Sequence, residues 1–122
     1  MARNVADLMV AAVVVADPAE TVGEVRQKMS QQDIGAVPVV DSDGVLRGIV
    51  TAEDLMKGYE ASLPISRVMT RPVQSLPPGA GIARAARHMR ERRHHHIVVV
   101  DDDRIVGILS SFDLLGLLED GD

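Results

Sequence analysis

The hydrophobic positions of this chain follow first a helical and then a strand-like pattern. Thr21 begins a capping box, and apolar residues then recur at helical spacing, at Val22, Val25 and Met29. Residues 34–40 form a short, apolar and β-branched run, which is typical of a buried strand. The pattern therefore predicts a helix that is followed by a strand.

A hairpin and a second helix are predicted to follow. Turn-forming residues at 41–44 separate the first strand from a second apolar strand at 45–50. Thr51 then predicts the cap of a helix that runs over residues 52–60. Ahead of the first helix, residues 13–15 predict a short strand. The expected order is thus strand, helix, strand, strand, helix.

The same order returns about sixty residues later, so the chain contains an internal repeat. The second set of elements is expected at residues 73–76, 82–91, 97–100 and 104–109, with a helix after Ser110. We expect one repeat in residues 1–60 and the other in residues 61–122. Each repeat is marginal in size, so the two are expected to share a core. The predicted fold class is α+β, with two β-α-β-β-α repeats related by pseudo-two-fold symmetry and small sheets packed with helices.

Composition limits the classes of function. The 122 residues include no cysteine, which excludes disulfides and thiolate metal sites. The formal net charge is −5, which argues against a broad nucleic-acid surface, although residues 84–93 are locally basic. The apolar run at residues 8–16 superficially resembles a signal peptide. However, Asp7 adjoins this run, and the segment aligns with an internal part of the second repeat. No run reaches the ~18 apolar residues of a membrane span. A cytoplasmic protein without membrane insertion is expected.

Two matching motifs close the repeats, GIVTAEDL at residues 48–55 and GILSSFDL at residues 107–114. Together with the strand AVPVVD at 36–41 and the lead-in VMTRPV at 68–73, they resemble the cystathionine-beta-synthase (CBS) domain. The resemblance covers about residues 5–118 and identifies a tandem CBS pair, also called a Bateman module. It implies a regulatory module that binds adenosine-containing ligands in clefts between the repeats and that forms dimers.

The first candidate site residues are Thr51 and Asp54, with Ser110 and Asp113 as their counterparts. A hydroxyl followed three residues later by an acid is also a capping box, which is a purely structural role. A carboxylate can instead accept hydrogen bonds from the two hydroxyls of a ribose, as in dinucleotide-binding folds. The resemblance implies that the aspartate holds ribose while the threonine or serine lies near phosphates. One residue pair can serve both purposes.

An adenine base needs an apolar slot, and the chain has only one tyrosine and one phenylalanine with which to stack it. An aliphatic slot is therefore expected, and its candidate residues are Val13, Val37, Ile49, Val73, Ile97 and Ile108. The structural alternative is that these residues form core.

The resemblance adds polar candidates to the nucleotide site. It implies that the adenine edge is read by backbone groups just before the second strand of each repeat. The residues concerned are Gly35, Ala36, His95 and His96. The lead-in adds Thr70, Arg71 and Pro72 as candidates.

The run Arg92-Arg-His-His-His96 has three interpretations. It can be a solvated basic patch at a helix end, where cations favour the helix dipole. His95 and His96 can contact phosphates, since related CBS proteins carry a basic pair there. A metal site formed by His88 with residues 94–96 is disfavoured, because adjacent residues of a strand point to opposite faces. We expect no metal site, and no catalytic residues, because no nucleophile–base arrangement is visible.

The repeats differ at this run, and the resemblance makes the difference informative. It implies that His95 and His96 face the cleft of Asp54, whereas the cleft of Asp113 meets uncharged residues of the first repeat. We therefore expect a phosphorylated ligand to prefer the Asp54 site.

Residues 112–118 are apolar on more than one face, which favours a homodimer through this helix. The predicted function is a sensor, not an enzyme, that binds AMP, ADP, ATP or S-adenosylmethionine as a regulatory ligand and modulates an unidentified protein. No obligatory cofactor is expected. The alternative is a ligand-free structural dimerisation module with degenerate clefts.

Overall fold

The computed structural model describes residues 2–120, so that residues 1, 121 and 122 of the expected repeats lie outside the described residues. The chain divides into two compact units. One unit is residues 14–73, and the other combines the residues up to Val13 with those from Gln74 onward. Each unit contains helices and a small sheet, so the predicted α+β class is confirmed.

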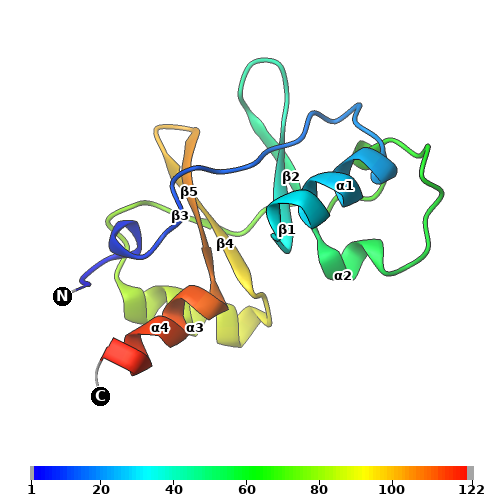
Figure 1. The fold of residues 1–122 in the computed structure, drawn as a ribbon. Coiled ribbons are helices and arrows are strands. Elements are labelled where there is room, and N and C mark those ends of the chain that lie inside the picture. The colour runs from blue at the N-terminus through cyan, green and yellow to red at the C-terminus, as the bar shows by residue number, and fades with distance from the viewer. Residues whose placement is uncertain (1, 121–122) are drawn as a thin grey trace. The chain divides into compact units, whose positions relative to one another are not determined.

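The unit of residues 14–73 contains a two-stranded antiparallel sheet and two α-helices (Figure 1). Its elements are α1 (Val22–Gln32), β1 (Ala36–Val40), β2 (Leu46–Thr51), α2 (Ala52–Leu55) and the 3-10 helix η2 (Ile65–Arg67). Strands β1 and β2 form the predicted hairpin, in which Val37 pairs with Val50. The turn at residues 41–44 is as predicted, and Gly44 adopts a left-handed φ of 80° there.

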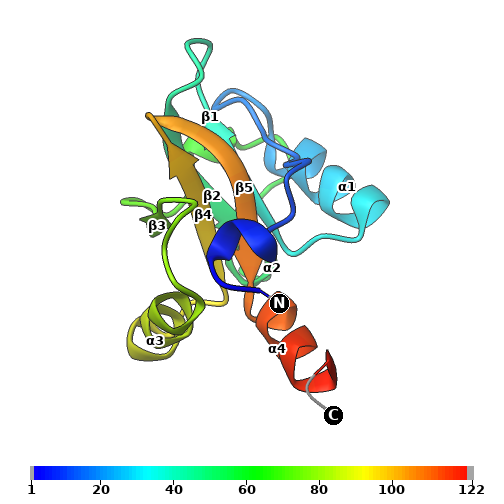
Figure 2. The same cartoon turned by 90° about the vertical axis from the view of Figure 1, so that its left-hand side faces the viewer.

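The second unit contains a three-stranded sheet in the order β3-β4-β5, and α4 continues directly from β5 (Figure 2). Its elements are the 3-10 helix η1 (Val5–Asp7), β3 (Ser75–Leu76), α3 (Ile82–Arg92), β4 (His96–Asp101), β5 (Arg104–Ser110) and α4 (Ser111–Asp120). Strand β3 is parallel to β4, and β4 is antiparallel to β5.

The first part of each sequence repeat, which contains Val5 in one repeat and Ile65 in the other, packs on the remainder of the opposite repeat. Val5 is fully buried in the unit of the second repeat, and its N–H donates to the Ala80 carbonyl at 2.9 Å. Its counterpart Ile65 is fully buried in the unit of the first repeat, and its N–H donates to the Glu20 carbonyl at 2.7 Å. The compact units therefore follow an exchange of segments and not the order of the sequence.

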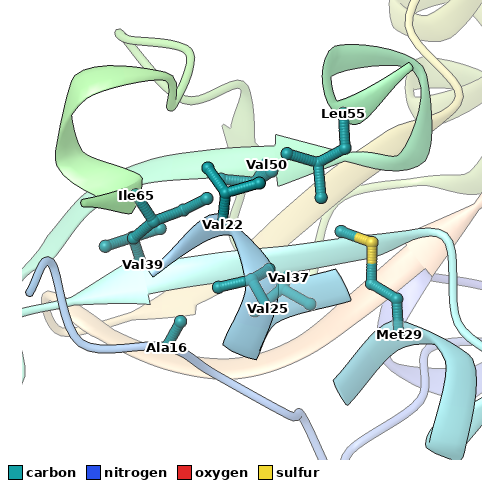
Figure 3. Close-up of a cluster of buried hydrophobic side chains, with 9 residues drawn as sticks. All are labelled: Ala16, Val22, Val25, Met29, Val37, Val39, Val50, Leu55 and Ile65. Carbon is teal, nitrogen blue, oxygen red and sulfur yellow. The ribbon is translucent and has the colours of Figure 1, made fainter. Parts of the chain in front are cut away.

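The core of the unit of residues 14–73 is formed by small and β-branched side chains. The predicted apolar stripe of α1, Val22, Val25 and Met29, is buried against the sheet. The complete cluster is Ala16, Val22, Val25, Met29, Val37, Val39, Val50, Leu55 and Ile65 (Figure 3). It includes Ile65 from the exchanged segment, so that segment completes the core.

The second helix of the first repeat is shorter than predicted. The helix that begins at Ala52 ends at Leu55 and not near residue 60. The Arg26 guanidinium donates to the Leu55 carbonyl at 2.7 Å and to the Tyr59 carbonyl at 3.3 Å, and Gly58 has a left-handed φ of 72°. These carbonyls are thus satisfied by a side chain and not by further helix.

The predicted strands near the start of each repeat are also reduced. Residues 13–15, all of which the structure describes, form no strand, and only Ala16 makes a single bridge, to Val39. In the second repeat, β3 is limited to Ser75 and Leu76 where residues 73–76 were expected. Pro18, two residues after this bridge, limits pairing beyond it because proline lacks the N–H that a strand ladder needs.

The hairpin turn of the first sheet contains an aspartate with a shifted pKa. The Asp41 carboxylate accepts hydrogen bonds from the Val45 N–H, from the Asp43 N–H and from Nε of Arg47 at 2.7 Å. The pKa of Asp41 is lowered, first by the Val45 N–H and then by the Arg47 side chain. This carboxylate serves the turn and not a ligand.

Candidate functional site

The candidate site of the unit of residues 14–73 lies where β2 passes into α2. The N–H of Thr51 donates to Oδ2 of Asp54 at 3.0 Å, and the N–H of Asp54 donates to Oγ1 of Thr51 at 3.2 Å. This reciprocal pair is the capping box that the sequence predicts. It holds the Asp54 carboxylate in one orientation at the junction.

A third residue, Thr70, reaches the same carboxylate. Its hydroxyl lies 3.5 Å from Oδ2 of Asp54. Thr70 is held in place by two backbone hydrogen bonds with Ile49, at 2.8 and 3.1 Å. The interactions of Asp54 with the described residues therefore engage Oδ2 and its backbone, and leave Oδ1 available to a ligand.

The second unit repeats this junction where β5 passes into α4. The N–H of Ser110 donates to Oδ2 of Asp113 at 2.8 Å, and the N–H of Asp113 donates to Oγ of Ser110 at 3.1 Å. Both carboxylates are half-buried, so each keeps some exposure to solvent. The two junctions thus present equivalent carboxylates.

The first helical N–H of each junction is already used. Ala52 donates to the Gly35 carbonyl at 2.9 Å, and Ser111 donates to the His95 carbonyl at 2.8 Å. These bonds tie each helix start to the residue just before the preceding strand. Gly35 therefore lies beside the Asp54 junction and His95 beside the Asp113 junction, each through a carbonyl group that the fold itself engages.

The side chains around the two carboxylates differ. Val10 pairs with Ile108 in the second unit as Thr70 pairs with Ile49 in the first. Val10 has no hydroxyl and is 49% exposed. The Asp113 carboxylate therefore lacks the polar neighbour that Asp54 has.

The side chain of His95, the residue just before β4, lies beside the start of α4. Its Nδ1 is 3.3 Å from Oγ of Ser111, which places it in the same unit as Asp113. His96 is half-buried and is the first residue of β4. The expected role of both residues toward a ligand of Asp54 stays a prediction.

The candidate apolar and lead-in residues fall into two groups by burial. Val37 and Ile97 are fully buried and belong to the cores of their units. Ala36 is also buried, within β1. Ile49 is also buried, whereas Val13, Val73 and Ile108 are half-buried and Thr70, Arg71 and Pro72 are exposed. Within each unit, only the half-buried and exposed residues have surface to offer a ligand in this structure.

The comparison with protein families agrees with these twin junctions. The model of the CBS domain matches the chain twice, over residues 5–61 and 65–120. The chain belongs to the CBS domain family. The recognition of a tandem CBS pair from the sequence is confirmed.

Several relatives resemble this CBS pair over most of its length. The CBS domain-containing protein YhcV of Bacillus subtilis is 31% identical over 116 residues, which cover 91% of this chain and 82% of YhcV. The solved CBS domain pair of protein MJ0100, in complex with 5-methylthioadenosine and S-adenosyl-L-methionine, matches with a TM-score of 0.91. It is 27% identical, and the match covers 98% of both chains.

Enzymes are also among the relatives of this CBS pair, but only in part. The homoserine O-acetyltransferase of Methanohalobium evestigatum is 29% identical over 118 residues. The chain spans 24% of that enzyme.

Two further observations bear on the CBS pair. Among residues 2–120, no cluster of three or more histidine, aspartate or glutamate side chains could hold a metal ion. No helix of the described chain has the length and apolar character that a membrane span requires.

The sequence suggested both Asp54 and Thr70 as site residues of the CBS pair, but not the contact between them. The alignment of the repeats contains a usable signal, because it places Thr70 over Val10. Where one repeat has a polar residue and the other has an apolar residue at the equivalent position, the two sites differ.

Proposed function

We propose that this CBS pair is a regulatory module that binds an adenosine-containing ligand through its ribose. Asp54 and Asp113 would accept hydrogen bonds from the ribose hydroxyls. The observation that carries this proposal is that each carboxylate is fixed by a capping box that uses only Oδ2. A fixed acceptor lowers the entropy cost of binding.

The similarity to the MJ0100 pair supports the ligand class. Both molecules named in that complex, 5-methylthioadenosine and S-adenosyl-L-methionine, contain adenosine. AMP, ADP and ATP share the same adenosine group and belong to the proposed class. A ligand that binds two states of the module with different affinity would shift their populations and so alter the contact with a partner protein.

We propose that a phosphorylated ligand prefers Asp54 to Asp113. The contact of the Thr70 hydroxyl with Oδ2 of Asp54 is long, at 3.5 Å, so this hydroxyl can turn to donate to a ligand oxygen, whereas the equivalent Val10 has no hydroxyl. The sequence adds His95 and His96 as expected phosphate contacts of this site.

The test is a thermal shift panel with AMP, ADP, ATP and S-adenosylmethionine on the wild type, Asp54→Asn and Asp113→Asn. Asparagine keeps one acceptor for the helix cap but loses the charge and the second carboxylate oxygen. A ligand at a hundred times its Kd adds about 2.7 kcal/mol to the free energy of unfolding. We expect AMP, ADP or ATP to raise the Tm of the wild type, and Asp54→Asn to remove that rise.

Glu24→Gln provides a matched control, since Glu24 forms the same kind of capping box with Thr21 at α1. It should lower the Tm slightly and leave the ligand-induced rise unchanged. A rise that disappears in Asp113→Asn and persists in Asp54→Asn would reverse the preference. The absence of any rise across the panel would contradict ligand binding.

A second candidate function is a ligand-free dimerisation module, and exposed apolar residues of α4 favour a homodimer in either case. Phe112, Leu115 and Leu118 are 80%, 55% and 73% exposed and recur every three residues along the helix. We propose that this stripe contacts a second copy of the chain. Burial of one such side chain stabilises the contact by about 1.5–3 kcal/mol.

Sedimentation equilibrium of Leu115→Glu tests this contact. We expect the wild type to be a dimer and the variant to dissociate at least about tenfold more readily, because a buried unpaired charge is costly. Val45→Glu, a change at an exposed apolar residue of the other unit, should leave the dimer intact. A wild type that is monomeric at all concentrations would contradict the proposal.

A further inference from the structure

Helix α3 presents a row of arginines on its solvent-facing side. Ala85 and Met89 are buried against the rest of the unit, whereas Arg84, Arg87 and Arg90 are exposed. At about 100° per residue, Arg87 lies nearly opposite the buried side, and Arg84 and Arg90 flank it. We call these three residues the arginine face of α3. The helix itself is seen nearly end-on in Figure 2.

The arginine face takes no part in holding the fold together. Within the part of the chain that the structure describes, the side chains of Arg84, Arg87 and Arg90 form no hydrogen bond or ion pair. An exposed cation without a partner contributes little to stability. Arg90 lies in the last turn of α3, where a cation favours the helix dipole, but Arg84 and Arg87 lie outside that turn, so the fold gives no reason for the row as a whole.

The equivalent helix of the first repeat shows the opposite arrangement. Helix α1 has the same length as α3, and both of its cations are engaged by the fold. Arg26 donates to the Leu55 carbonyl at 2.7 Å. Lys28 forms a salt bridge with Glu20 at 2.7 Å and donates to the Val15 carbonyl at 2.8 Å. The cations of α1 serve the structure, whereas those of α3 are left for another contact.

The charge of α3 itself is opposite in sign to that of the whole chain. The sequence of α3, IARAARHMRER, contains four arginines and one glutamate, and its C-cap residue is Arg93. The formal net charge of the chain is −5. A local positive surface on an acidic protein attracts a short anionic segment. A longer polyanion would also reach the acidic surface of the rest of the protein, which repels it.

We propose that the arginine face of α3 is a docking surface for a carboxylate-rich segment of a partner protein. Arginine presents a planar fork of donors that matches a carboxylate in bidentate geometry. Arg84 and Arg90 are about 9 Å apart along the helix axis, which an extended acidic segment of about three residues would span. A single-stranded nucleic acid fits less well, because it needs stacking side chains and α3 contains no phenylalanine, tyrosine or tryptophan.

This docking surface would bind the partner protein that the module regulates under the proposed function. The docking proposal rests on that function only for the identity of the partner. Its binding is measured without an adenosine ligand. The ligand panel and the docking experiment can therefore fail independently.

The test is the fluorescence anisotropy of a labelled peptide that carries about four consecutive glutamates between neutral residues, titrated with the full chain in about 50 mM salt, where charge contacts are weakly screened. The variant Arg84→Gln/Arg87→Gln/Arg90→Gln removes the face and, because all three side chains are exposed, should keep the wild-type Tm. We expect it to weaken peptide binding about tenfold, as three surface ion pairs of modest strength would give.

A control variant, Lys57→Gln/Arg67→Gln/Arg104→Gln, removes the same charge from exposed residues elsewhere. It should change the affinity less than about twofold, since none of these three residues belongs to the arginine face. Equal weakening by both variants would show a general charge effect and overturn the proposal, as would the absence of peptide binding.

Two further measurements separate other occupants of the face. A labelled 20-nucleotide single strand that binds more tightly than the peptide, and depends on the three arginines, would make the face a nucleic-acid site and overturn the proposal. Conversion of a dimer to a monomer by the arginine variant, seen by sedimentation, would make the face a contact between copies and also overturn it.

Discussion

Replacing Gly48 with alanine is expected to lower the free energy of unfolding by about 1–3 kcal/mol, because the added methyl group overpacks a closed site. A Cβ atom at Gly48 would lie 2.6 Å from Sδ of Met69, 2.8 Å from its Cγ and 3.1 Å from its Cβ. Since Cγ of Met69 is too close as well as Sδ, a change of rotamer at the end of the side chain cannot relieve the overlap. Met69 must change its χ1 rotamer, or the lead-in segment or strand β2 must move.

The second unit contains the same contact, in which Met9 lies against Gly107. Gly107→Ala is therefore expected to be similarly destabilising, and Gly79→Ala, where no atom lies within 4 Å of the added Cβ, serves as the control. Urea unfolding measures all three changes. The double variant Gly48→Ala/Met69→Ala should cost less than the sum of its single changes, because the overlap disappears. Additive costs would contradict the packing explanation.

Replacing Ile65 with alanine is expected to cost about 2–5 kcal/mol, as for other fully buried isoleucines. Val5→Ala, at the equivalent buried place, is expected to cost about 1.5 kcal/mol for the loss of two buried carbon groups. The location of each effect is as informative as its size. Val5, from the first sequence repeat, completes the core formed by the second repeat, and Ile65, from the second repeat, completes the core formed by the first.

Native-state hydrogen exchange can locate these effects, since it measures local opening. Ile65→Ala should reduce the protection of β1 and β2 most strongly, although residue 65 belongs to the second sequence repeat. Val5→Ala should reduce the protection of β4 and β5 instead. A loss of protection in β1 and β2 upon Val5→Ala would contradict the exchange of segments.

Local chemistry made much of this fold predictable. A hydroxyl and an acid three residues apart are enough to predict the caps at Thr21, Thr51 and Ser110, and all three form. The two hairpins were also predicted, because turn residues interrupt apolar runs there. The family was recognised because these motifs recur in order.

Contacts between distant parts of the sequence were beyond this reasoning. Helix α2 ends early because Arg26, which lies 29 residues before Leu55, bonds to its carbonyl. The repeat alignment shows that Val5 and Ile65 are equivalent, but a symmetric alignment cannot say which body each contacts.

The candidate site was predicted to a similar extent. The carboxylates Asp54 and Asp113 were found by the spacing of their capping boxes, which is a local feature. The hydroxyl of Thr70 reaches Asp54 from 16 residues away, and the hydrogen bond of His95 with Ser111 spans the same separation. Such pairs depend on strand register and follow only from the folded structure.

The exchange of segments also sets an order in which the chain can fold during its synthesis. Residues 14–73 are continuous, so this unit can close once they have left the ribosome. The N-terminal segment, although it emerges first, must wait for strand β5, which lies near the other end of the chain. Until then Val5 and Met9 are exposed to water, and closing so long a loop makes the second unit the slower of the two to form.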